Sequence, residues 1–178
     1  AQELLEKAKQ GNADAQRTVG VAYLQGTVTF PKDNEEAVKW LQKAADQGNT
    51  EGQFWLGRMY GQGLVAIPRD DDGSLLLDTK KEAVKWYRLA AEQGLKAAQF
   101  YLGTMYYNGQ GVPPDDKEAV NWFRLAAEQG YTSAQYNLGW MYDNGKGVIE
   151  DDKEAINWYR LGAEQGWRSV EYTVVGTY

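Results

Sequence analysis

Apolar residues recur along this chain with the spacing of an amphipathic helix, and the pattern is present in four copies. In the fourth copy, Ala134, Leu138 and Tyr142 follow one another at intervals of four residues. Such spacing places side chains on one stripe of an α-helix, whereas a half-buried strand would alternate apolar and polar residues. We name this predicted element helix A; its copies lie within residues 12–26, 49–63, 95–109 and 131–145.

A second pattern, helix B, follows each helix A. Its clearest copies are DDKEAVNWFRLAAEQG at 115–130 and DDKEAINWYRLGAEQG at 151–166, and weaker copies occupy 34–48 and 80–94. Each copy begins with the spacing of a capping box, an Asp or Thr followed three residues later by Glu, and ends at a glycine suited to a helix C-terminus. The predicted capping pairs are Asp33 with Glu36, Thr79 with Glu82, Asp115 with Glu118, and Asp151 with Glu154.

Every copy keeps one tryptophan in helix B and one glycine inside helix A. Each helix B has a Trp flanked by small residues on one stripe, so we predict four buried core rings: Trp40, Trp86, Trp122 and Trp158. Each helix A keeps an interior glycine, which costs about 1 kcal/mol relative to Ala. We therefore predict that a neighbouring helix approaches these glycines too closely for a side chain: Gly20, Gly57, Gly103 and Gly139.

The copies predict one α-solenoid domain over residues 1–178. Within it, repeats occupy 12–48, 49–94, 95–130 and 131–166, and residues 1–11 and 167–178 are partial or capping helices. The second repeat is longer, because Gly48 and Gly94 are 46 residues apart where later closing glycines are 36 apart. The extra residues lie near 64–78, and insertions of this kind can carry binding specificity.

The combined pattern resembles the Sel1-like repeat, a relative of the tetratricopeptide repeat. It reads A-x-x-x-L-G-x-x-Y-x-x-G-x-G-V and then D-x-x-x-A-x-x-W-Y-x-x-A-A-x-x-G. The fourth copy carries these matching residues: Ala134, Leu138, Gly139, Tyr142, Gly145, Gly147, Val148, Ala155, Trp158, Tyr159, Ala163 and Gly166. The resemblance implies an all-α fold, a right-handed α-solenoid of antiparallel helix pairs, here with about ten helices including partial terminal ones.

The same resemblance implies an adaptor or scaffold, often in a bacterial envelope, secretion or host-interaction setting. Some relatives carry a disulfide across each repeat, and this chain departs from them because it has no Cys. Together with the lack of an initiator Met, the resemblance favours a periplasmic or secreted protein.

Composition narrows the partner classes. The formal net charge is −6 and no basic stripe is visible, so we predict no nucleic-acid partner, whereas a basic or neutral peptide fits. No apolar run approaches the ~18 residues that a membrane-spanning helix needs, so no membrane insertion is predicted. The absence of His and Cys excludes histidine bases, thiol nucleophiles and cysteine–histidine zinc sites.

Motifs for other chemistry are incomplete. The pairs Gly109/Gly111 and Gly145/Gly147 follow a helix and lack the rest of a phosphate-loop pattern. The acidic run at 70–72 lacks the terminal carboxylates of an EF-hand loop. We therefore predict no cofactor, no metal ion and no catalytic residue. Because carboxylates are abundant, a hydrolase that uses an Asp/Glu pair is kept as a further alternative.

Positions that differ between copies are free for recognition, since those that stay the same serve the fold. In related helical repeats the A helices line the concave surface, so we predict a non-enzymatic scaffold that binds a peptide or protein segment there. A carbohydrate or peptidoglycan-fragment binding module is the alternative. Ordinary packing is an equal interpretation for Phe54, Phe100 and Tyr136. The candidate partner-binding residues are Arg17, Val21, Phe54, Arg58, Phe100, Thr104, Tyr107, Tyr136, Trp140 and Asp143.

Overall fold

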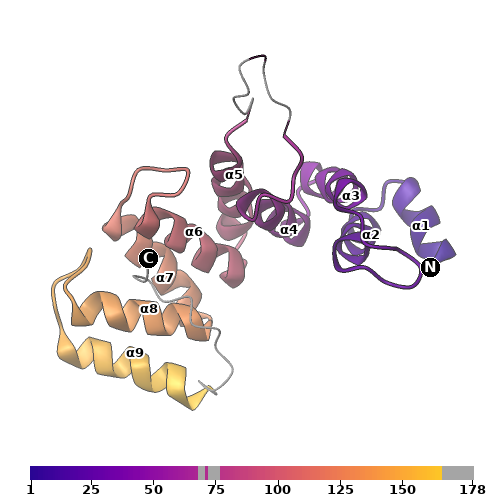
Figure 1. Cartoon of the computed structure of the whole chain (residues 1–178). Coiled ribbons are helices and arrows are strands. Elements are labelled where there is room, and N and C mark those ends of the chain that lie inside the picture. Colours follow the sequence, from indigo (N-terminus) through magenta and orange to yellow (C-terminus); the bar gives the residue numbers. More distant parts are fainter. Residues whose placement is uncertain (68–70, 72–76, 166–178) are drawn as a thin grey trace. The chain divides into compact units, whose positions relative to one another are not determined.

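A computed structural model describes residues 1–67, 71 and 77–165 of the chain. The predicted all-helical fold is confirmed, because these residues form nine helices and no strand (Figure 1). The helices are α1 (Gln2–Lys9), α2 (Ala13–Gln25), α3 (Asn34–Asp46), α4 (Thr50–Gly61), α5 (Thr79–Glu92), α6 (Lys96–Asn108), α7 (Asp116–Glu128), α8 (Thr132–Asp143) and α9 (Asp152–Glu164). The predicted C-terminal capping helix at 167–178 lies outside the described residues.

The chain divides into two compact units, Ala1–Gln93 with α1 to α5 and Gly94–Tyr178 with α6 to α9. Each helix A packs against the helix B that follows it: α2 with α3 and α4 with α5 in the first unit, α6 with α7 and α8 with α9 in the second. The preceding helix B packs on the same helix A from its other side, as α3 does on α4 and α7 on α8. An inner helix B is therefore covered by two A helices.

Four aspartates cap the B helices. The Asp33 carboxylate accepts hydrogen bonds from the main-chain N–H groups of Glu35 and Glu36 at 2.9 and 3.0 Å. The same arrangement recurs at Asp78, Asp115 and Asp151. The predicted cap at Thr79 is wrong, because Thr79 is the first residue of α5 and Asp78 precedes it. The extra residues before α5 obscure the alignment with the other copies.

The second half of the predicted capping box is also wrong. The main-chain N–H that Glu would satisfy is instead donated at 3.0 Å to a helix A carbonyl, in the pairs Asp33–Tyr23, Asp115–Tyr106 and Asp151–Tyr142. This bond ties the start of helix B to the end of helix A. In the second repeat the Lys80 ammonium donates to the Gly61 carbonyl at 2.6 Å and links the same two elements.

The interior glycines lie against the residue that follows each helix B tryptophan. A Cβ added to Gly103 would lie 2.8 Å from the Phe123 ring, and one added to Gly139 would lie 2.9 Å from the Tyr159 ring. Two carbon atoms at such separations overlap. The pairs Gly20–Leu41 and Gly57–Tyr87 make the same contact. The predicted close approach is confirmed.

The tryptophans are less buried than predicted. Trp86 is 6% exposed, but Trp40, Trp122 and Trp158 are only half-buried. The neighbouring residue fills the core instead, and Phe123 has no exposed surface. Because an inner helix B packs against two A helices, its buried arc is wider than one stripe, and the Trp lies at the edge of that arc.

A ladder of glutamines joins three consecutive helices near their ends. The Gln16 amide, which is buried in α2, donates to the Ala8 carbonyl of α1 at 3.0 Å. Its oxygen accepts a hydrogen bond of 2.7 Å from the Gln47 amide at the end of α3. Gln47 also donates to the Lys43 carbonyl at 3.3 Å. The buried Gln16 side chain therefore both donates and accepts a hydrogen bond, and the exposed Gln47 amide donates twice.

Later repeats contain parts of the same ladder. Gln53 donates to the Ala45 carbonyl at 3.3 Å and accepts from Gln93 at 2.7 Å, and Gln129 donates to Gln99 at 2.8 Å. Our sequence analysis missed this network. Its signal was a glutamine at one place in every helix A, at Gln16, Gln53, Gln99 and Gln135.

The glycine contact predicts opposite effects for two Gly→Ala changes in the second unit. Gly103→Ala should lower the free energy of unfolding by about 1–3 kcal/mol, because the new methyl group must displace the Phe123 ring. In Gly162→Ala, the nearest atoms lie 3.8 Å from the added Cβ. That control should gain up to about 1 kcal/mol, since Ala is the better helix former. Urea unfolding followed by circular dichroism measures both, and equal losses would contradict the contact.

The ladder predicts a large cost for Gln53→Leu, which keeps the volume and removes the amide. The Ala45 carbonyl loses its side-chain donor and the Gln93 amide loses an acceptor, so we expect a loss of about 2–4 kcal/mol. Gln42→Leu is the control, because the Gln42 amide donates to the exposed Asp46 carboxylate at the surface of α3. Its free energy of unfolding should stay within about 0.5 kcal/mol of the unmodified protein. Urea unfolding followed by circular dichroism also measures these two variants. If Gln53→Leu leaves the free energy of unfolding unchanged, the ladder adds no stability.

Candidate partner-binding surface

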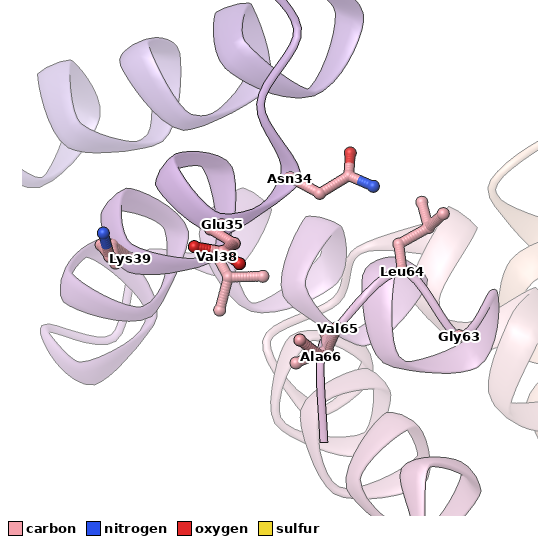
Figure 2. Close-up of a pocket in the computed structure, with 8 residues that line it drawn as sticks. All are labelled: Asn34, Glu35, Val38, Lys39, Gly63, Leu64, Val65 and Ala66. Carbon is pink, nitrogen blue, oxygen red and sulfur yellow. The ribbon is translucent and has the colours of Figure 1, made fainter. Parts of the chain in front are cut away.

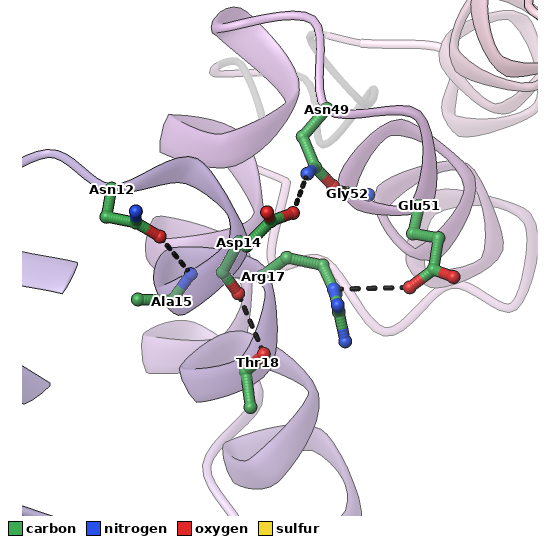
Figure 3. Close-up of polar contacts among 8 residues, drawn as sticks. All are labelled: Asn12, Asp14, Ala15, Arg17, Thr18, Asn49, Glu51 and Gly52. Atoms are coloured by element: carbon green, nitrogen blue, oxygen red, sulfur yellow. Dashed lines mark hydrogen bonds and ion pairs between the residues drawn. The ribbon is translucent and has the colours of Figure 1, made fainter. Parts of the chain in front are cut away.

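In the first unit, two A helices are joined across their exposed sides. Arg17 of α2 lies 3.2 Å from the Glu51 carboxylate of α4, and Figure 3 shows its side chain extending toward that residue. The contact is an ion pair in which the Nε–H is not aligned for a hydrogen bond. Next to it, the Asn49 amide donates to the Asp14 carboxylate at 2.8 Å. Arg17, predicted as a partner-binding residue, thus also bridges two repeats.

An aromatic group lies on α4. The Phe54 ring contacts Trp55 at 5.7 Å and Tyr87 of α5 at 6.0 Å between ring centres. The Arg58 guanidinium lies over the Trp55 ring, 4.9 Å from its centre, in a cation–π contact. Phe54, Trp55 and Arg58 are all half-buried, as is Val21 on α2. Sequence analysis missed Trp55, although it lies between two residues that it selected.

Phe100 of α6 contributes little exposed surface, whereas Thr104 of the same helix is half-buried. Phe100 is 3% exposed and its ring lies 5.9 Å from Phe123 and 5.1 Å from Tyr131. The Thr104 hydroxyl donates to the Phe100 carbonyl within the same helix at 3.0 Å. The structure therefore places Phe100 in the core, in agreement with the packing interpretation.

Tyr107 and Trp140 come together from neighbouring A helices. Their ring centres are 5.9 Å apart and the ring planes are nearly perpendicular, an edge-to-face contact between α6 and α8. Both side chains are half-buried. Burial raises the pKa of Tyr107 above its ordinary value, and the charge of Asp116 raises it further. The two rings thus hold each other in place and still have accessible surface.

Asp143 and Tyr136 flank a third aromatic residue, Tyr159 of α9. The Tyr136 and Tyr159 ring centres are 5.5 Å apart. Burial raises the pKa of Tyr159 to about 12, with further contributions from the Asp143 charge and from Tyr136. Asp143 itself is exposed. Tyr159 matches the repeat pattern but was not predicted as a site residue; its signal was the bulky residue after every helix B tryptophan.

The described residues were compared with the ligand sets that metal ions need. Among residues 1–67, 71 and 77–165, no three His, Cys, Asp or Glu residues form a group that could hold one. Two carboxylates of the acidic run at 70–72 lie outside the described residues. Within the described helices, none is long and apolar enough to cross a membrane.

Comparison with known proteins identifies the same repeats. A family model described as the Sel1 repeat matches residues 13–49, 50–95, 96–131 and 132–167. No curated protein sequence matches the chain closely enough to count as a relative.

Solved bacterial structures share the fold. A protective antigen of uropathogenic Escherichia coli with an SLR fold is 42% identical, with a TM-score of 0.82 over 93% of this chain and 33% of that chain. A Sel1 repeat protein from Oxalobacter formigenes is 38% identical, with a TM-score of 0.76 over 88% and 58%. An immunity protein from Pseudomonas aeruginosa is 25% identical, with a TM-score of 0.56 over 93% and 57%. The chain spans less than two thirds of the length of each of these three proteins.

The environment of Tyr159 predicts a loss of stability at alkaline pH. An ordinary tyrosine ionises near 10.0 and Tyr159 near 12. Between these values the unfolded chain releases a proton that the folded chain keeps, so stability falls as pH rises through this range. Asp143→Asn removes a negative charge and should lower the pKa of Tyr159. NMR titration of the tyrosine Cζ resonances measures this, with Tyr159→Phe assigning the signal; an unchanged pKa in Asp143→Asn would contradict the assignment.

Proposed function

Because the chain belongs to the Sel1 repeat family, we propose that it is a non-enzymatic scaffold that binds a peptide or protein segment on its A helices. Sel1 repeat proteins commonly serve as protein-interaction scaffolds. The proposal adds the face and its residues. Binding uses the exposed sides of α6 and α8 in the second unit, and those of α2 and α4 in the first.

The contact between Tyr107 and Trp140 carries the proposal. Tyr and Trp are the residues most enriched in the energetic centres of protein interfaces, together with Arg. Rings already held by each other lose little side-chain freedom when a partner covers them, so more of the contact energy goes into binding. Phe54, Trp55 and Arg58 form a comparable group on α4, where the cation–π contact orients the guanidinium.

The charge of the surface favours a partner with basic residues. Asp143 is exposed at the end of α8, the helix that also carries Trp140. The whole chain has a net charge of −6. A Lys or Arg of the partner would be attracted by this field during association. The ionic contribution should therefore weaken as salt is added.

Carbohydrate binding is the second candidate. Half-buried aromatic side chains such as Trp140 and Trp55 are also suited to contacts with the apolar faces of sugar rings. This candidate requires polar groups beside the rings, and Asp143 is one such group. Titration with peptidoglycan fragments under tryptophan fluorescence tests it, because a flat response removes it.

The scaffold proposal predicts that the double variant Tyr107→Ala/Trp140→Ala loses its partner while keeping its helices. Each truncation at the centre of an interface typically costs about 2 kcal/mol or more, so capture should fall at least about thirtyfold for each ring. Quantitative mass spectrometry of proteins retained from the native source by each immobilised variant measures this.

Leu125→Ala is the matched control, because Leu125 is an apolar side chain of α7 that is 44% exposed on a helix B. It should retain every protein that the unmodified chain retains. Circular dichroism verifies that all variants stay folded. If the control and the double variant lose the same proteins, or if neither loses any, the A-helix surface is not the binding face.

A further inference from the structure

A pocket of about 570 Å³ lies between the start of α3, a helix B, and the loop that follows α4. Asn34, Glu35, Val38 and Lys39 of α3 line one side, and residues 63–66, which follow α4, line the other (Figure 2). We call it the α3 pocket. Its volume is within the range of about 300–1,000 Å³ that is usual for small-ligand sites.

The second unit shows how this place is closed in another repeat. There, Gly147 follows α8 in the left-handed region at φ 69°, and a Cβ on it would collide with the Asp116 carbonyl at the start of α7. The loop therefore lies directly on the helix. Val148 packs against the core cluster that includes Val120, which is 2% exposed.

Val65 occupies the place of Gly147 in the first unit. The register is fixed by equivalent main-chain bonds, Leu64 to the Met59 carbonyl and Lys146 to the Met141 carbonyl, both at 2.9 Å. A β-branched residue rarely adopts positive φ, and its side chain prevents the close approach that Gly147 makes. The α3 pocket lies between the loop after α4 and the start of α3, and Val38, at the position of Val120, is half-buried.

The pocket has an apolar interior and an acidic edge. Val38, Leu64, Val65 and Ala66 provide the apolar surface. Glu35 lies at the edge and forms no side-chain hydrogen bond or ion pair with the described residues.

Lys39 does not neutralise this edge, because its ammonium lies 2.7 Å from the Glu36 carboxylate. The pKa of Lys39 is raised, chiefly by its hydrogen bond to Glu36 and that residue's charge, and the charges of Glu35 and Asp33 also contribute. The local field around the edge is therefore negative.

We propose that the α3 pocket binds a peptide segment that inserts a Leu, Ile or Val side chain against Val38 and Val65 and places a Lys or Arg beside Glu35. The apolar walls select the aliphatic side chain, because its burial removes apolar surface from water. The carboxylate selects the neighbouring cation and fixes the direction of the segment. None of its lining residues belongs to the proposed A-helix surface, so this peptide segment would be a second one.

Three acetylated, amidated hexapeptides test the proposal against the full chain labelled with nitrogen-15: GSLKSG, GSLESG and GSAKSG. GSLKSG should shift the main-chain amides of Val38, Leu64 and Val65. GSLESG should bind about threefold or more weaker because its charge is repelled by Glu35. GSAKSG should bind about tenfold or more weaker because it lacks the aliphatic side chain.

Two variants separate the charge effect from the fold. Glu35→Gln should remove most of the difference between GSLKSG and GSLESG and keep the preference for Leu over Ala. Lys117→Gln is the matched control, because Lys117 has the equivalent place in α7, where Gly147 closes the loop; it should change none of the affinities. Absence of shifts at the three amides, an equal response to all peptides, or shifts confined to Tyr107 and Trp140 would overturn the proposal. The last result would leave the A-helix surface standing.

Discussion

The close approach of each helix A to its helix B determines the rest of the repeat. Gly103 allows the Phe123 ring to lie against the main chain of α6, and Gly139 does the same for Tyr159 against α8. The contact tolerates different bulky residues in helix B but only hydrogen on the helix A side. It therefore fixes the register of each pair more strictly than the general requirement for an apolar core, which accepts many side chains of about the right size.

This contact also reaches the surface. When the bulky residue is tyrosine, its ring packs against the glycine of helix A, as Tyr159 does against Gly139, and the side chain can stay partly exposed. Tyr159 is the example, since its ring contacts Tyr136, and burial, followed by the Asp143 charge, raises its pKa to about 12. A packing residue thereby positions two side chains of the proposed binding surface. The glutamine ladder restricts how neighbouring helices can be oriented, because a buried amide must face both a donor and an acceptor.

Periodicity predicted the helices because four copies of one pattern reinforce each other, and the interior glycine stood out as a costly residue kept every time. The same method failed where a residue's role depends on a second neighbour. The half-buried Trp122 was assigned to the core because one stripe was assumed, whereas α7 packs against two helices. Thr79 was chosen as a cap because the longer second repeat shifts the alignment. The buried glutamines of the A helices were not predicted, because each forms hydrogen bonds to neighbouring helices that a single helical pattern does not reveal.

The candidate surface was harder to predict than the fold for a physical reason. Variable positions show where a repeat is free to change, but only contacts show which of these side chains are held in place and which are buried. Tyr107 and Trp140 are candidates because they form an edge-to-face contact between two helices and remain accessible. Phe100 is a poor candidate because it is buried. The α3 pocket extends this argument to the loops. The first two repeats have valine, Val28 and Val65, at the place where the last two have Gly111 and Gly147. The α3 pocket lies beside Val65, so we infer that this difference between copies matters more for a binding site than the positions that all copies share.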